Sequence, residues 1–131
     1  MRRVAVTGLG LLTSIGNDVQ SSWKNLISCK SGIRKINHFD VNNMPCKIAG
    51  YLSNNHDASD YFDINKTLEK KDLNRNDRFI QYGLIAAQSA IIDSGIHNLS
   101  EDKKLNVGVS VGSGIGGLET IYNNAIIWIT K

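Results

Sequence analysis

The longest apolar segment of the chain lies between Asp77 and Ser94 and predicts a buried helix. Apolar residues fill most of its positions, and the polar residues that break the apolar surface are chiefly Gln81, Gln88, Ser89 and Asp93. A helix that is apolar nearly all round packs against other elements on most of its sides. Gly95 predicts the C-terminal end of this helix, because glycine readily adopts the left-handed conformation found there.

A second apolar helix is predicted at the end of the sequence. Its apolar residues recur at helical spacing and are Leu118, Ile121, Tyr122, Ala125, Ile126 and Ile129. Only Thr130 and Lys131 follow, without the glycine, asparagine or basic turn that normally ends a helix. We therefore expect the sequence to be cut inside a larger fold.

Two runs of β-branched and small apolar residues predict buried strands, at residues 3–9 and 106–111. Neither run alternates with polar residues, which is typical of strands that are covered on both faces. Each run leads into glycines, Gly8-Leu9-Gly10 in the first case and residues 112–117 in the second. A shorter strand is predicted at residues 47–52, after Pro45.

Between the first two strands, Val19, Trp23, Leu26 and Ile27 recur at helical spacing, with Asn17 or Asp18 as the expected N-cap. Residues 33–44 are expected to be irregular, and residues 57–71 to hold a short helix at most. The order is strand, helix, irregular region, long helix, strand, helix. This order predicts an α/β fold with crossover connections.

Composition narrows the class of protein. The 131 residues carry a net charge of +3, which is too mild to indicate nucleic-acid binding. The two cysteines, Cys29 and Cys46, are too few for a disulfide scaffold, so we expect a cytoplasmic protein with reduced thiols. No cysteine or histidine pair has zinc-site spacing, and no segment is long and apolar enough to span a bilayer. The interrupted apolar start does not resemble a signal peptide.

Gly112, Gly114 and Gly117 match the G-x-G-x-x-G pattern of dinucleotide-binding folds, between a predicted strand and a predicted helix. Backbone amides at such a helix start can hold a pyrophosphate. The acidic residue that would support this interpretation falls beyond Lys131. The alternative is a tight strand-to-helix turn in which glycines allow close packing.

Several motifs, in order along the chain, resemble the β-ketoacyl-acyl carrier protein synthase family. The matching segments are residues 2–10 (RRVAVTGLG), Trp23-Lys24-Asn25-Leu26 with Ser31-Gly32-Ile33, Phe39-Asp40, residues 77–83 (DRFIQYG), Asp93-Ser94-Gly95 and residues 108–117 (GVSVGSGIGG). Ordered matches over nearly the whole chain are much more specific than one glycine motif. In this interpretation, the glycines shape a turn beside an acyl pocket and bind no nucleotide.

The resemblance implies a thiolase-like fold of duplicated α/β halves, layered αβαβα, and a homodimer. This chain would be the incomplete N-terminal part of that fold. The implied reaction is a decarboxylating Claisen condensation that needs no cofactor. A cysteine accepts the acyl chain from acyl carrier protein, and the carbanion left when malonyl-acyl carrier protein loses carbon dioxide attacks the thioester. A thiolate nucleophile with a depressed pKa and hydrogen-bond donors to the oxyanion suit this chemistry.

The resemblance places no catalytic residue in this chain. The family's nucleophile lies in a T-A-C-x-S motif, which the sequence lacks. Cys29 and Cys46 lie in other contexts, and none of His38, His56 and His97 matches a catalytic histidine of the family. We therefore expect residues 1–131 to be a synthase segment truncated before the catalytic cysteine and inactive alone.

Three positions carry functional residues of the family. Ile115 matches the residue that gates the acyl pocket in elongating, type II enzymes, where type I relatives tend to have glycine. Lys71 and Arg75 match basic residues that contact acyl carrier protein, and Asn74 replaces a third, usually basic, residue. A packing isoleucine and a solvated basic face are the plain alternatives. A polyketide-type synthase and a non-catalytic chain-length factor also fit the sequence.

Overall fold

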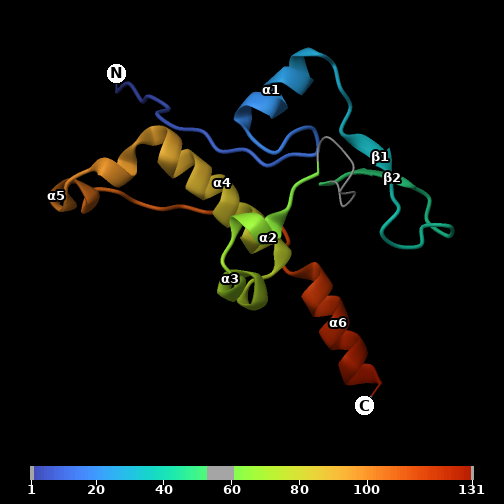
Figure 1. Ribbon diagram of the computed structural model, residues 1–131. Helices are drawn as coiled ribbons and strands as arrows, with labels where there is room; N and C mark the ends of the chain where they lie inside the picture. The colour runs from blue at the N-terminus through green and yellow to red at the C-terminus, as the bar shows by residue number, and fades with distance from the viewer. Residues whose placement is uncertain (1, 53–60, 131) are drawn as a thin grey trace.

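The computed structural model describes residues 2–52 and 61–130. Figure 1 shows an open arrangement of short elements around one long helix, α4 (Arg78–Ser94). The other helices are α1 (Val19–Ile27), α2 (Ile64–Thr67), α3 (Lys70–Arg75), α5 (Glu101–Lys104) and α6 (Leu118–Ile129), with a 3-10 turn η1 (Ile96–Asn98). The strands of the described residues are β1 (Ile33–Lys35) and β2 (Ile48–Gly50). The mixed content of helices and strands confirms the predicted α/β class.

Local signals set the ends of the predicted helices. Asp18 is the N-cap of α1: its carboxylate accepts a hydrogen bond from the Ser21 amide at 2.7 Å, and the Ser21 hydroxyl accepts one from the Asp18 amide at 3.2 Å. This reciprocal pair satisfies two amides that the helix leaves without partners. Gly95 ends α4 with a φ of 67°, in the left-handed region as predicted.

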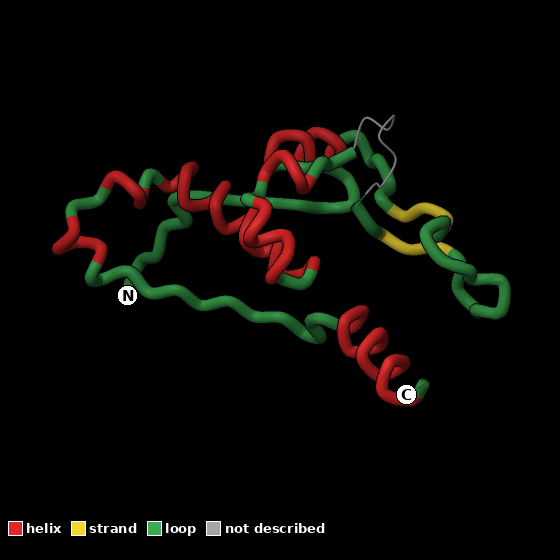
Figure 2. The backbone as a smooth tube through the Cα atoms, turned by 60° about the horizontal axis from the view of Figure 1, so that its bottom comes forward, coloured by secondary structure: helices red, strands yellow, loops and turns green. Residues whose placement is uncertain are grey.

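The sheet of the described residues differs from the predicted one. β1 and β2, which lie between α1 and α2 in the sequence, pair antiparallel with Arg34 opposite Ala49. Figure 2 shows this small sheet at one side of the molecule. β2 falls within the strand predicted at residues 47–52. β1 falls in a segment that we expected to be irregular, because its mixed sequence Ile33-Arg34-Lys35 lacks a clear period.

The strands predicted at residues 3–9 and 106–111 are wrong for this structure. Both segments run extended but lie outside every ladder of the described chain, and residues 105–106 form a turn. Val4 is 94% exposed and Val109 is 89% exposed. An extended segment becomes a strand only when a neighbour supplies hydrogen-bond partners. No described segment does so here.

The N-terminal segment instead packs on α4. The Leu9 amide donates a hydrogen bond to the Asp93 carboxylate at 2.8 Å. A Cβ atom added at Gly8 or Gly10 would meet the backbone of α4 near Ala90, which means that the two backbones are in close contact. Glycine is required there because any side chain would separate the two segments.

Very little of the described chain is buried. Ile85 of α4 is 5% exposed, and the other buried residues of the described ranges are Val41, Ser22, Gln81 and the glycines Gly16 and Gly32. The expectation that α4 is buried on most sides is therefore wrong in this structure, because no second layer covers its remaining faces. α6 is also exposed along its length and projects away from the other elements (Figure 1).

Candidate functional site

The short helix α3 carries the predicted docking residues Lys71 and Arg75, one helical turn apart and both exposed. The Lys71 ammonium lies 2.9 Å from the Glu69 carboxylate. That hydrogen bond, together with the charge of Asp72, raises the pKa of Lys71. The same hydrogen bond lowers the pKa of Glu69. Part of the positive charge of Lys71 is therefore already balanced within α3.

Gln81 of α4 fixes the end of α3. Its side-chain amide donates hydrogen bonds to the Leu73 carbonyl at 3.0 Å and to the Asn76 carbonyl at 2.7 Å. Gln81 is 9% exposed, and its neighbours in α4 are mostly apolar. Carbonyls at a helix C-terminus lack intrahelical partners, so this amide satisfies groups that α3 cannot satisfy itself. The direction of α3 thus depends on a side chain from the next helix.

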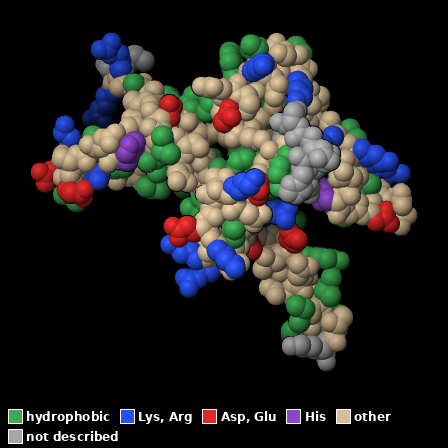
Figure 3. Space-filling model, in the orientation of Figure 1, with side chains coloured by type: hydrophobic (Ala, Val, Ile, Leu, Met, Phe, Trp, Pro, Cys, Tyr) green, Lys and Arg blue, Asp and Glu red, His purple; other side chains and the backbone are tan. Residues whose placement is uncertain are grey.

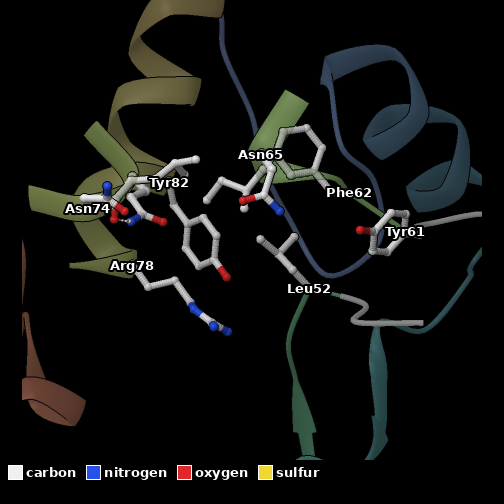
Figure 4. Close-up of a pocket in the computed structure, with 10 residues that line it drawn as sticks. Leu52, Tyr61, Phe62, Asn65, Asn74, Arg78 and Tyr82 are labelled. Carbon is white, nitrogen blue, oxygen red and sulfur yellow. Dashed lines mark hydrogen bonds between the residues drawn. The ribbon is translucent and has the colours of Figure 1, made fainter. Parts of the chain in front are cut away.

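A cavity of about 440 Å³ opens beside this junction (Figure 4). It is lined by residues of α2, α3 and α4 and of the loops before them: Leu52, Tyr61, Phe62, Ile64, Asn65, Leu73, Asn74, Arg78, Gln81 and Tyr82. Figure 4 shows the Tyr82 ring in the middle of this group and the Arg78 side chain extending along its edge. Asn74 and Arg78, from two different helices, therefore lie on the wall of one cavity.

The glycine-rich turn that carries Ile115 meets the other side of the first turn of α4. A Cβ atom added at Gly116 would meet the Phe79 ring, with Cε1 at 2.8 Å. Gly117 has a φ of 63°, and Ile115 is 78% exposed beside a smaller cavity of about 230 Å³. The first two turns of α4 are thus in contact both with α3 and with the glycine-rich turn that carries Ile115.

Asp77 lies where α4 and α6 begin. Its carboxylate accepts a hydrogen bond from the Thr120 hydroxyl at 2.5 Å, and it also occupies the space that a Gly117 side chain would need. A phosphate bound at the start of α6 would face this negative charge. Glu119 adds a second carboxylate in the same turn. The position of these two acids counts against nucleotide binding by residues 112–117.

Comparison with known proteins identifies the family to which the chain belongs. Residues 1–126 match the profile of the family described as "Beta-ketoacyl synthase, N-terminal domain". The chain belongs to the β-ketoacyl synthase family. The resemblance inferred from the ordered motifs is therefore confirmed, and the mixed fold is consistent with the N-terminal part of a thiolase-like synthase domain.

Several β-ketoacyl synthases resemble the chain closely. It is 45% identical over 120 residues to a protein named 3-oxoacyl-[acyl-carrier-protein] synthase 2 from Vibrio cholerae, and equally similar to the protein of that name from Vibrio harveyi. Each match covers 92% of this chain and 27% of the relative. A synthase 2 from Staphylococcus aureus is 40% identical over 119 residues, which cover 91% of this chain and 27% of the relative. The chain thus spans about a quarter of the length of these relatives.

The cysteines and histidines are scattered over the described chain. Cys29 and Cys46 are free and exposed. His38 packs against Tyr51, with ring centroids 4.9 Å apart, and His97 belongs to η1. His56 lies outside the described residues. No group of three potential metal ligands occurs in residues 2–52 and 61–130, and none of the helices described there could cross a membrane.

Sequence reasoning missed the residues that hold the candidate site together. Gln81 and Asp77 each connect α4 to a neighbouring element. Gln81 left one signal, since it is a glutamine in the middle of an apolar helix pattern, where a polar side chain needs a partner. Arg78 left none, because its proximity to Asn74 depends on the angle between α3 and α4.

Proposed function

We propose that this chain is the N-terminal part of an elongating, type II β-ketoacyl-acyl carrier protein synthase, and that the whole protein extends fatty acids. The match of residues 1–126 to the family carries this proposal. In the proposed reaction, the acyl group moves from the carrier to an enzyme cysteine with release of the carrier thiol. Malonyl-carrier then loses carbon dioxide, and its carbanion attacks the acyl thioester and expels the cysteine thiolate.

Residues of this chain would bind and orient the substrates, since the sequence lacks the nucleophile motif. Lys71 and Arg75 would attract the acidic carrier protein. Charges at the rim of an interface accelerate encounter and fix orientation more than they add affinity. Their exposure and the fixed position of α3 support this role.

Ile115 would fill the end of the acyl pocket. Ile115 lies on the turn that packs against Phe79, at a position where a glycine would leave no side chain. This position supports a role for the isoleucine side chain as a gate that moves when an acyl chain enters. Large apolar side chains at the ends of such pockets set the length of ligand that fits.

The test is a condensation assay analysed by mass spectrometry, with acyl- and malonyl-acyl carrier protein as substrates. We expect a β-ketoacyl product two carbons longer from the longest protein that the gene encodes, and none from the 131-residue chain. A protein that contains this chain and makes no product, but has the T-A-C-x-S cysteine, contradicts the proposal. Turnover by the 131 residues alone contradicts the assignment of the chemistry to other parts of the protein.

The proposal includes a homodimer that works in the cytoplasm. The family resemblance implies the dimer, and two exposed free thiols suit a reducing compartment. Sedimentation of the longest gene product at twice its chain mass is the expected result for the dimer. A monomer at all concentrations contradicts it.

A further inference from the structure

The proposed docking surface consists of Lys71, Asn74 and Arg75 of α3, and it lacks one of the positive charges expected there. Its central position is Asn74, where the family usually has a basic residue, and Lys71 is already paired with Glu69 at 2.9 Å. Of the α3 side chains expected to contact the carrier, only Arg75 is then a cation that forms no ion pair in the described residues. A surface with one unpaired cation would attract an acidic partner weakly.

Arg78 lies next to the position of this missing charge. It is the first residue of α4, three positions beyond the last residue of α3, and it is exposed. It lines the same cavity as Asn74, and Figure 4 shows its side chain extended at the edge of that cavity, below the Tyr82 ring in this view. Figure 3 shows basic side chains collected over α2 and α3 on this face of the molecule.

The guanidinium of Arg78 forms no salt bridge with any residue of the described chain. Glu119 lines two neighbouring cavities with it but does not come within ion-pair distance. Over residues 66–78 the sequence has five basic and three acidic residues, so this segment keeps a net positive charge. Arg78 contributes one positive charge to this segment, and no carboxylate of the described chain forms a salt bridge with it.

We propose that Arg78 replaces the missing positive charge at Asn74 and binds a carboxylate of the acidic carrier protein. This inference rests on the proposed function. A guanidinium is suited to the task, because its planar fork can donate two parallel hydrogen bonds to one carboxylate. The hydrogen bonds of Gln81 join the end of α3 to α4, and Arg75 and Arg78 are the residues on either side of this junction, three positions apart.

The test measures the affinity of the longest gene product for fluorescently labelled acyl carrier protein between about 50 and about 300 mM NaCl, a range over which salt screens exposed charges. We expect Arg78→Ala to weaken binding roughly threefold at the low salt concentration and to lower the salt dependence. Arg78→Glu should weaken it about tenfold, because like charges then face each other. Arg78→Lys should bind nearly as the unaltered protein does.

Lys103→Ala is the matched control, because it removes the same charge from the exposed helix α5 at the far end of α4 (Figure 1). Its affinity should be unchanged. If Arg78→Ala binds as tightly as Lys103→Ala while Arg75→Ala binds more weakly, the inference about Arg78 is overturned and the docking surface stands. If the unaltered protein does not bind the carrier at all, the proposed function fails as well.

Discussion

At the scale of single residues, Gly10 sets how closely the N-terminal segment approaches α4. A Cβ atom at Gly10 would lie 2.8 Å from the Ala90 amide nitrogen and still closer to the Ala86 carbonyl, both of them backbone atoms that cannot rotate away. Gly83 is the contrasting case, since no atom lies within 4 Å of its added Cβ. The same substitution therefore has opposite consequences at the two glycines.

We expect Gly10→Ala to lower the free energy of unfolding by about 1–3 kcal/mol, because it forces two backbones apart. Gly83→Ala should raise it by about 0.5–1 kcal/mol, since alanine favours the helix and finds open space. Urea unfolding of the longest gene product, followed by circular dichroism, measures both. Equal effects at the two positions would mean that the close contact with α4 does not exist in solution.

Ile115 gives a second prediction at this scale, which depends on the proposed function. We expect Ile115→Phe to reduce condensation with long acyl chains by roughly 10- to 100-fold, because a pocket shortened by one ring loses the space for a few methylene groups. Short acyl chains should react normally. Ile115→Val is the conservative control. Product lengths determined by mass spectrometry would contradict the gate assignment if the two variants gave the same distribution.

At the scale of secondary structure elements, Gln81 links α3 to α4. We expect Gln81→Leu to speed amide exchange in α3 several-fold, because each lost hydrogen bond contributes about 1 kcal/mol. Gln88→Leu, an exposed glutamine in the same helix, is the control and should leave α3 unchanged. Hydrogen exchange read by mass spectrometry needs no carrier protein. Unchanged exchange in α3 after Gln81→Leu would show that other contacts hold that helix.

The N-cap of α1 predicts a dependence on pH. Hydrogen bonds from the Ser21 and Gln20 amides lower the pKa of Asp18 in the folded chain, although partial burial opposes them. The cap therefore contributes its full stability above the unfolded pKa, near 4, and loses it as pH falls through the lower folded pKa. We expect Asp18→Ala to cost about 1 kcal/mol at pH 7 and almost nothing near pH 2. Urea unfolding of the longest gene product at the two pH values measures this.

Elements with strong local signals could be predicted, and elements that depend on distant partners could not. α1 and α4 follow from capping residues and helical periodicity, and both occur where the sequence places them. β1 was missed because three residues of mixed character form a strand only through β2. The segments at residues 3–9 and 106–111 have strand-like sequences but no ladder partner in the described chain. Their local propensity alone could not fix their structure.

At the scale of the whole molecule, the described chain exposes far more apolar surface than a stable monomer normally does. Val4, Val109 and Trp128 are exposed, and so are most apolar residues of α6. Contiguous apolar surface of this kind is usually covered by another element or another chain. The candidate site follows the same rule. Lys71, Asn74 and Arg75 were chosen from family motifs, whereas contacts between elements, such as that of Asp77 with Thr120, could not be predicted.

We expect the isolated 131-residue chain to behave as a loosely packed state. It should bind the dye ANS and unfold without a sharp thermal transition, because the buried core that gives cooperativity is almost absent. Differential scanning calorimetry and ANS fluorescence measure these properties. A soluble monomer with a single sharp transition would contradict the prediction.

The contact between Leu9 and Asp93 also has a consequence for synthesis. The two residues are 84 positions apart in the sequence. At about 5–20 residues per second, the N-terminal segment leaves the ribosome roughly 4–17 seconds before the part of α4 on which it packs. During that interval Gly8, Leu9 and Gly10 lack the α4 surface on which they pack. The first residues of the nascent chain are therefore an expected binding site for a chaperone that acts at the ribosome.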